Sequence, residues 1–315
     1  MSPPIIFLIF NRPKLTRRVF ACIRAARPER FFIAADGPRA DRPGEAQLCD
    51  EARSVIDGVD WPCAVKTLFR EKNLGCRVAV STAIDWFFDH EPEGIILEDD
   101  CVPDATFFPY AKELLIHYRN DERVMVIAGD HFHGDAHQPP HSYFLSRYPH
   151  CWGWASWRRA WQHYDHDMSQ WPALRNTDWL LTVGDGNRDF QRYWTRIFDM
   201  AYAGKVDSWA YRWTFSCWAQ SGLTILPALN LVTNIGFSED ATRTKGSDEQ
   251  LDSIPIESLS FPLSHLSSMV RDYAADHWTD QHVFKQMSVS FVMKIMLRLR
   301  RSLGKYVKLT GRFCQ

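Results

Sequence analysis

An unbroken apolar run leads directly into three carboxylates in the segment Gly94-Ile95-Ile96-Leu97-Glu98-Asp99-Asp100. A short apolar run bounded by polar residues predicts a buried β-strand. In open α/β sheets, ligands bind just outside the carboxyl ends of the strands, where this triplet would lie. Adjacent carboxylates repel one another unless a cation or solvent relieves them, and Mg²⁺ or Mn²⁺ prefers such hard oxygen ligands. The segment therefore predicts a metal site, with a solvated acidic turn as the alternative.

The residues around this segment alternate between strand and helix patterns. Pro13 suits the first turn of a helix, which supports a helix that begins at residue 13. The pattern predicts strands at 4–10, 31–35, 65–69, 94–97 and 124–128, and helices from 13 to 26 and at 45–57, 76–89 and 105–119. Such alternation indicates an α/β fold with a mostly parallel sheet and helices on both faces.

The remainder of the chain is less regular. We expect residues 1–130 to form a nucleotide-sugar-binding half and residues 131–250 to form the acceptor and catalytic half of the same domain. Residues 251–315 would form a helical, basic C-terminal extension, with a polar loop or linker near 238–260.

Bulk composition is that of an ordinary globular protein. The 315 residues are 45% hydrophobic and 24% charged, so the chain is long and apolar enough to form a large core. Most of the 13 Trp lie between residues 152 and 218, where they either fill a core or stack on sugar rings. The eight Cys form no Cys-x-x-Cys pair, and no membrane-spanning or signal-like run is seen. We therefore expect a cytoplasmic protein with reduced thiols.

Charge is unevenly distributed along the chain. Eight Lys or Arg and no acid lie after residue 280, which leaves 29 basic and 38 acidic residues, a net charge of −9, on the rest. A helix over residues 289–307 would carry one apolar stripe and, opposite it, Lys294, Arg298, Arg301 and Lys305. Such a helix either docks on an anionic membrane surface or packs on the acidic body. The acidic body argues against a nucleic-acid partner.

Several enzyme classes are disfavoured by missing motifs. The chain has no Gly-x-Gly-x-x-Gly fingerprint, no P-loop and no Gly-x-Ser-x-Gly elbow. These absences argue against dehydrogenases, P-loop NTPases and α/β-hydrolases.

Five segments, in order across residues 4 to about 245, resemble one family. The sequence resembles bacterial GT-A-type glycosyltransferases (hemolysin-like, or glycosyltransferase family 2-like) and is more distantly similar to the N-acetylglucosaminyltransferase I family. The segments are Leu8-Ile9-Phe10-Asn11-Arg12-Pro13, Arg30 to Gly37, Ile96-Leu97-Glu98-Asp99-Asp100 with Phe107-Phe108, Tyr148 to Trp154, and Asp207-Ser208-Trp209.

The resemblance implies a role for each matching residue. Arg12 would contact the nucleotide or its phosphates, Asp36 would bind the base, and Glu98 and Asp99 would face the base and ribose. Asp100 would be the ligand of Mn²⁺ or Mg²⁺. Trp152-Gly153-Trp154 would line the sugar or acceptor pocket, and Asp207 would be the catalytic base.

Each of these residues also has a structural interpretation. Arg12 could be solvated, Asp36 could belong to the turn Asp36-Gly37-Pro38, and the tryptophans could be core. Asp207 could cap a turn. His131 and His133 have a spacing that can bind metal on a strand, but a chain with 12 His contains such a pair by chance.

Two positions depart from the family pattern. Ala210 stands where relatives often have a second acid, and Arg243 where they often have His. These departures put a second acid and a protein metal ligand from this region in doubt.

The function expected from the resemblance is transfer of a sugar from a nucleotide-sugar, expected to be a UDP-sugar, to a hydroxyl of a glycan or lipid-linked acceptor, with inversion. The rivals are a sugar-nucleotide pyrophosphorylase-like enzyme, which should carry a Gly-rich N-terminal loop, and a non-enzymatic, membrane-associated hemolysin-like protein. If the chain is a glycosyltransferase, the acidic triplet is a variant of the family's Asp-x-Asp metal-binding motif.

Overall fold

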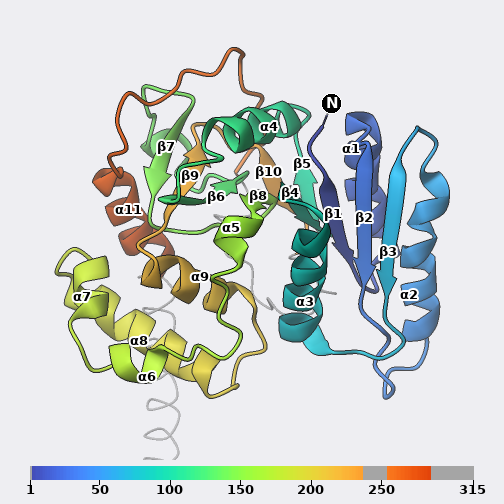
Figure 1. Cartoon of the computed structure of the whole chain (residues 1–315), viewed down its shortest axis with the longest axis horizontal. Coiled ribbons are helices and arrows are strands. Elements are labelled where there is room, and N and C mark those ends of the chain that lie inside the picture. Colours follow the sequence, from blue (N-terminus) through green and yellow to red (C-terminus); the bar gives the residue numbers. More distant parts are fainter. Residues whose placement is uncertain (1, 237–253, 285–315) are drawn as a thin grey trace, which may run out of the picture.

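The computed structural model describes residues 2–236 and 254–284. The predicted amphipathic helix at 289–307, Arg243 and most of the polar stretch at 238–260 lie outside these residues. Within them, one eight-stranded sheet has the order β3-β2-β1-β4-β8-β6-β9-β7 (Figure 1). Its strands are β1 (Ile5–Ile9), β2 (Arg30–Ala35), β3 (Ala64–Phe69), β4 (Glu93–Glu98), β6 (Val124–Ala128), β7 (Tyr143–Ser146), β8 (Trp154–Trp157) and β9 (Leu223–Pro227).

Most strands of this sheet run in one direction. Strands β3, β2, β1 and β4 are parallel neighbours, and β6 is parallel to β9. Strand β8 is antiparallel to both β4 and β6, and β7 is antiparallel to β9, so β8 and β7 are the two reversed strands. The predicted α/β class with a mostly parallel sheet is therefore confirmed.

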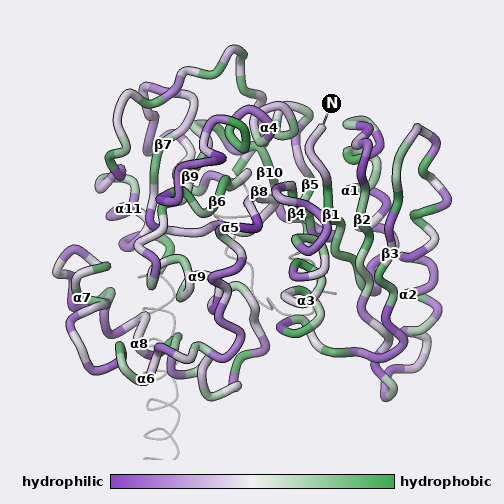
Figure 2. Tube along the Cα trace, in the orientation of Figure 1, coloured by the Kyte–Doolittle hydropathy of each residue, from purple (hydrophilic) through white to green (hydrophobic). Residues whose placement is uncertain are grey.

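Helices cover both faces of the sheet, as predicted. Alternate residues of β1 face opposite ways: Ile5 and Phe7 join one core cluster, and Ile6 and Leu8 join the other. The first cluster contains residues of α1 (Pro13–Ala26), α2 (Glu45–Arg53) and α4 (Phe107–His117). The second contains residues of α3 (Gly75–His90), α8 (Arg188–Tyr202) and α9 (Ala210–Ala219). Figure 2 shows hydrophobic colour along β1 and β2, which lie between these layers.

The tryptophan-rich stretch completes the sheet and builds its second core. Strand β8 inserts between β4 and β6, and its first residue, Trp154, is fully buried. Large aromatics bury about 150–250 Å² each and dominate the energetics of a core. The buried tryptophans of this cluster are Trp154, Trp161, Trp171, Trp194, Trp209, Trp213 and Trp218. Core packing, one of the two interpretations of these residues, accounts for them.

Short elements connect these parts. Strand β5 (Cys101–Pro103) pairs antiparallel with β10 (Val232–Asn234) in a separate two-stranded sheet. Helix α7 (Trp179–Val183) precedes α8. The others are η1 (Ser54–Gly58), η2 (Gly134–Ala136), α5 (Arg158–Trp161) and α6 (Trp171–Leu174).

The C-terminal extension differs from the helical segment predicted from residue 251. Residues 254–272 contain no helix, and α11 (Tyr273–Thr279) follows, continuing as a π-helical turn, η3 (Asp280–Phe284). Backbone bonds hold this segment on the sheet: Ser142 N donates to Ser264 O, and Asp272 N donates to Leu145 O. Backbone contacts at β7 thus hold part of residues 254–272, which form no helix.

The described residues contain free thiols and no helix suited to cross a membrane. Seven cysteines of the described residues are free thiols, in line with the expectation from the sequence. Among the described helices, none is long and apolar enough to cross a membrane.

Candidate active site

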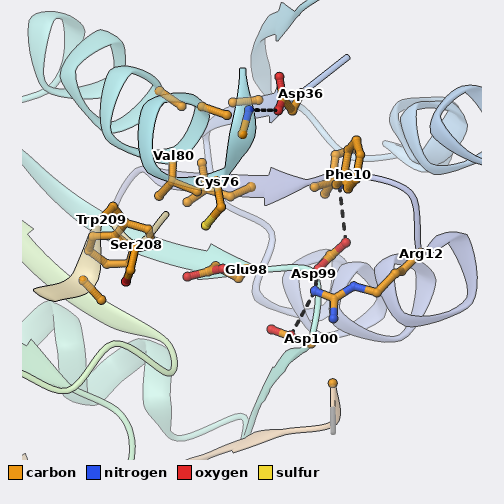
Figure 3. A pocket seen from close by; sticks show the side chains of 18 of the residues that line it. Phe10, Arg12, Asp36, Cys76, Val80, Glu98, Asp99, Asp100, Ser208 and Trp209 are labelled. Carbon is orange, nitrogen blue, oxygen red and sulfur yellow. Dashed lines mark hydrogen bonds and ion pairs between the residues drawn. The ribbon is translucent and has the colours of Figure 1, made fainter. Parts of the chain in front are cut away.

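A cavity of about 520 Å³ opens at the carboxyl ends of β1, β2, β3 and β4 (Figure 3). This is the edge of the sheet at which the acidic triplet was expected to bind a ligand. The cavity volume falls in the usual range of ligand pockets, roughly 300–1,000 Å³. Seven of the nine predicted site residues line it: Arg12, Asp36, Glu98, Asp99, Asp100, Trp152 and Asp207.

Arg12 follows β1 and pairs with two acids of the triplet. Its Nη2 forms a short ion pair with Asp99 Oδ1 and lies 2.9 Å from Asp100 Oδ2. Burial opposes the charged guanidinium, but the two carboxylates outweigh this effect and raise the pKa of Arg12. The cation that relieves the repulsion within the triplet is therefore a residue of the chain.

Asp99 is the most buried acid of the triplet, with a side chain 4% exposed. Phe10 N donates to its Oδ2 at 3.3 Å. Burial raises the pKa of Asp99 to about 6, the nearby Asp100 carboxylate adds to this shift, and Arg12 opposes it. Asp99 thus fixes the loop after β1 to the end of β4, and its contact with a ribose or base stays a prediction.

Asp36, at the end of β2, holds the turn that starts α3. Its carboxylate accepts hydrogen bonds from Gly37 N at 2.9 Å, from Leu74 N at 3.0 and 3.1 Å, and from Gly75 N at 3.2 Å. Burial raises the pKa of Asp36, and these backbone bonds oppose the rise. Asp36 therefore has a structural contact with the start of α3, while base recognition by this carboxylate stays a prediction.

Asp207 binds the first turn of α3 across the cavity wall. Its Oδ2 accepts from Cys76 N and its Oδ1 from Arg77 N, both at 3.0 Å. Carboxylates are favoured at helix N-termini because they satisfy free N–H groups and complement the helix dipole. The capping role considered for Asp207 is thus present.

The tryptophan segment divides between the cavity and the core. Trp152 lines the cavity, whereas the assignment of Trp154 to the pocket is wrong: its ring is fully buried and stacks on Trp209 with centroids 5.7 Å apart. Gly153 does not line the cavity either, and its φ of 64° is a conformation that favours glycine. It turns the chain into β8, which carries Trp154 inward.

Several lining residues escaped the sequence analysis. Arg70 and Asn73 lie in the loop after β3, where the rule for parallel strands could have found them. Arg39 forms an ion pair with Glu45 of α2, and Asn234 comes from β10, so nothing in the local sequence connects them with the triplet.

Gly236 packs closely against the Arg12–Asp100 pair. A Cβ on Gly236 would lie 2.2 Å from Asp100 Oδ2 and 2.9 Å from Arg12 Nη1. The approach follows from the β5–β10 pairing and from Ile235 N, which donates to Asp100 O at 2.8 Å.

The chain offers only part of a metal site at this place. Among the described residues, no group of three or more His, Cys, Asp or Glu side chains could hold a metal ion. Glu98 and Asp100 both line the cavity, as Figure 3 shows. Mg²⁺ is commonly bound by one or two carboxylates together with water and substrate phosphates. The donor set therefore fits a divalent ion that a phosphate ligand completes.

His131 and His133 do not line this cavity. Both are buried, with ring centroids 5.1 Å apart, and His133 Nε2 lies 3.0 Å from Ala275 O and 3.1 Å from Thr279 Oγ1. His133 thus anchors α11 to the body, which accounts for that histidine without a metal.

Comparisons with known proteins add little to this geometry. No protein-family model and no curated protein sequence matches the chain. Among solved structures, HddC from Yersinia pseudotuberculosis is similar over 50% of this chain and 77% of its own, with 12% identity and a TM-score of 0.30. A likeness at that level does not bear on the function.

Proposed function

We propose that the chain is a metal-dependent glycosyltransferase that transfers a sugar from a nucleotide-sugar, a UDP-sugar in the first instance, to a glycan or lipid-linked hydroxyl. The observation that carries the proposal is the meeting of Glu98, Asp99 and Asp100 with Arg12 in one cavity at the carboxyl ends of parallel strands. Acids for a metal, a cation for phosphates and a cavity of about 520 Å³ suit a nucleoside diphosphate.

Different residues of the cavity would contact the two ends of the nucleotide-sugar donor. The diphosphate would lie between Arg12 and Asp100, with Asp100 holding Mn²⁺ or Mg²⁺ and Glu98 facing the ribose. The base would extend toward Asp36, Arg39 and Asn73, which line the part of the cavity after β2 and β3. A bound divalent ion would supply charge stabilisation for the departing diphosphate.

The acceptor would enter beside Trp152, Ser208 and Trp209, which line the wall contributed by the second half of the chain. In an inverting transfer, the acceptor oxygen bonds to the anomeric carbon as the bond from that carbon to the diphosphate breaks. Asp207, which lines the same cavity, would take the proton of that hydroxyl.

The first test measures binding of UDP with and without Mn²⁺ by calorimetry, in the wild type and in Asp100→Ala. We expect Mn²⁺ to increase the affinity for UDP in the wild type and to have no effect in the variant. Asp50→Ala removes an exposed carboxylate of α2 whose side chain is 76% exposed, and it should behave as the wild type. Metal dependence that survives Asp100→Ala would exclude Asp100 as the ligand.

A second measurement separates the enzymatic rivals. Glycosyltransfer releases UDP from a UDP-sugar, whereas a pyrophosphorylase joins a nucleoside triphosphate and a sugar phosphate into a nucleotide-sugar and releases pyrophosphate. A panel of UDP-sugars with Mn²⁺, analysed for UDP release, tests the first reaction. Synthesis of nucleotide-sugar without UDP release would favour the pyrophosphorylase, and failure to bind any nucleotide would favour a non-enzymatic protein.

A further inference from the structure

Asp100 already has a cation within ion-pair distance. Arg12 Nη2 lies 2.9 Å from Asp100 Oδ2, and the same nitrogen pairs with Asp99. Both partners border the cavity, where the Arg12 side chain is 19% exposed and that of Asp100 is 13% exposed. The carboxylate proposed as the metal ligand is thus neutralised by the chain itself.

The surroundings fix the backbone of this pair, but the Arg12 side chain can still rotate toward the cavity. Arg12 immediately precedes α1, and its carbonyl accepts Thr16 N at 2.9 Å, so its backbone is held. Asp99 is held by Phe10 N. Rotation of the long Arg12 side chain is the movement that remains, and the cavity lies on its open side.

A guanidinium and a divalent ion compete for the same oxygen. Two cations within a few ångströms of one carboxylate repel each other, and the repulsion is strong where solvent is scarce. Gly236 increases the competition, because its backbone closes over Asp100 Oδ2 and Arg12 Nη1 and limits the space for both cations. In the absence of another anion, Arg12 therefore weakens metal binding at Asp100.

A diphosphate changes this balance. It brings several negative charges into the cavity, and guanidinium groups bind phosphate oxygens in a bidentate manner. Arg12 then has a partner besides the acids, and Asp100 becomes available to a metal that the diphosphate also coordinates.

We propose that Arg12 is a latch on Asp100, which suppresses metal binding until a nucleoside diphosphate draws the guanidinium away. The inference rests on the proposed function and goes beyond it, because it states that metal and nucleotide bind cooperatively through a residue of the chain. Binding cooperativity is reciprocal, so the metal must strengthen nucleotide binding by the same factor.

The test measures Mn²⁺ affinity by electron paramagnetic resonance in the wild type and in Arg12→Met, with and without UDP. Arg12→Met should bind Mn²⁺ without nucleotide about tenfold more tightly than the wild type, within the usual range of coupling between sites, about 5–150-fold. The factor by which UDP strengthens Mn²⁺ binding should fall correspondingly. Adding Asp100→Ala to Arg12→Met should remove the gain.

Arg39→Met is the matched control. It deletes a cation from the same cavity, but Arg39 pairs with Glu45 rather than with the triplet. Its Mn²⁺ affinity without nucleotide should equal that of the wild type, since general loss of positive charge in the cavity is not the proposed cause. An equal gain in both variants would overturn the latch.

The remaining outcomes separate the latch from the proposed function. If Arg12→Met binds Mn²⁺ no more tightly than the wild type while the wild type binds UDP with Mn²⁺, the latch is wrong and the function stands. If the wild type does not bind UDP under any condition, the function fails, whatever the variant does. Should Arg12→Met fold poorly by circular dichroism, Arg12→Gln replaces it, because a neutral amide can still donate a hydrogen bond to Asp99 but carries no charge that competes with a metal, and a gain is again required.

Discussion

At the scale of single residues, Asp207 combines a structural contact with a proposed chemical one. Its two oxygens accept the N–H groups of Cys76 and Arg77, at the start of a helix 131 and 130 residues away in sequence. Removing one such bond should cost about 1 kcal/mol of the free energy of unfolding. Loss of a general base should lower turnover by ~10²–10⁴. The two effects differ enough to be measured separately.

We expect Asp207→Asn to lower turnover of the UDP-sugar by at least about 10² while UDP affinity is retained, because an amide accepts no proton from the acceptor. The melting temperature should fall by only a few degrees. Asn187→Ala is the matched control, since Asn187 caps α8 by accepting from Asp189 N at 2.9 Å and Phe190 N at 3.3 Å, away from the cavity. If both variants lose stability equally and keep normal turnover, Asp207 is a cap and not the base.

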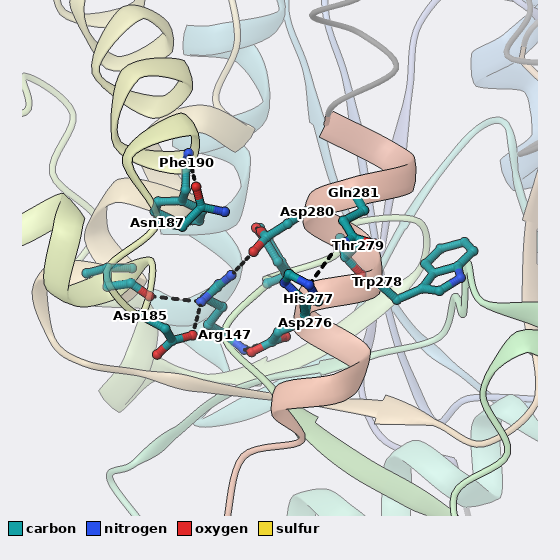
Figure 4. A network of polar contacts seen from close by, with 12 residues as sticks. Arg147, Asp185, Asn187, Phe190, Asp276, His277, Trp278, Thr279, Asp280 and Gln281 are labelled. Atoms are coloured by element: carbon teal, nitrogen blue, oxygen red, sulfur yellow. Dashed lines mark hydrogen bonds and ion pairs between the residues drawn. The ribbon is translucent and has the colours of Figure 1, made fainter.

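At the scale of elements, Arg147, which follows β7, joins η3, the continuation of α11, to the end of α7 and the loop after it (Figure 4). Its guanidinium donates to Val183 O at 3.0 Å, to Asp185 Oδ2 at 2.6 Å and to Asp280 Oδ2 at 2.6 Å. The side chain is 4% exposed and that of Asp280 is 9% exposed, so this is a buried ion pair. Removing one partner of such a pair leaves the other charge uncompensated, which costs roughly 3–5 kcal/mol.

Arg147→Met should therefore destabilise the fold by several kcal/mol and increase amide hydrogen exchange in residues 273–284. UDP affinity should change little, because Arg147 does not line the cavity. Arg192→Met removes an exposed arginine of α8, 72% exposed and paired with an exposed Asp189, and should shift stability by less than about 1 kcal/mol. Faster exchange throughout the chain, without a local effect on α11, would contradict the assignment of Arg147 as a clamp.

At the scale of the whole molecule, buried histidines make stability depend on pH. Burial lowers the pKa of His131 to about 4 and that of His133 to about 3, whereas the unfolded chain has values near 6.5. The unfolded state therefore binds more protons below pH 6.5, and stability falls as the pH drops from about 6.5 toward 4. At pH 5 the loss is about 2 kcal/mol for each imidazole.

Asp99 and Asp276 contribute with the opposite sign, because burial raises both carboxyl pKa values to about 6 and the folded state then binds their protons more tightly. Comparison with a variant isolates the histidine effect. Urea denaturation at pH 7.5 and pH 5.0 should show a smaller loss of stability on acidification in His133→Gln than in the wild type. An identical pH dependence in the two proteins would remove His133 from this account.

Local patterns in the sequence were sufficient for the first half of the fold. The strands β1, β2, β4 and β6 and the helices near them follow the predicted ranges closely, because burial of a strand or of one helix face leaves an apolar signal within a few residues. The predicted range of β3 also matches, although none of its residues is buried. The position of the acidic triplet at a strand end followed from the same signal. The carboxyl ends of parallel strands meet at one edge, which placed Asp100 in a ligand site. Arg12 and Asp36 were assigned to the same site only through the family resemblance.

Contacts between distant segments could be read only from the folded chain. Strand β8 inserts between β4 and β6 in the reversed direction and carries Trp154 into the core, although Trp152 two residues earlier borders the cavity. The capping of α3 by Asp207 likewise depends on where α9 packs. The Arg12–Asp99 pair joins residues 87 positions apart, and no periodicity records which cation faces which acid. Periodicity reports whether a side chain is buried, whereas the identity of its partner depends on how whole elements pack, and the proposed chemistry depends on that partner.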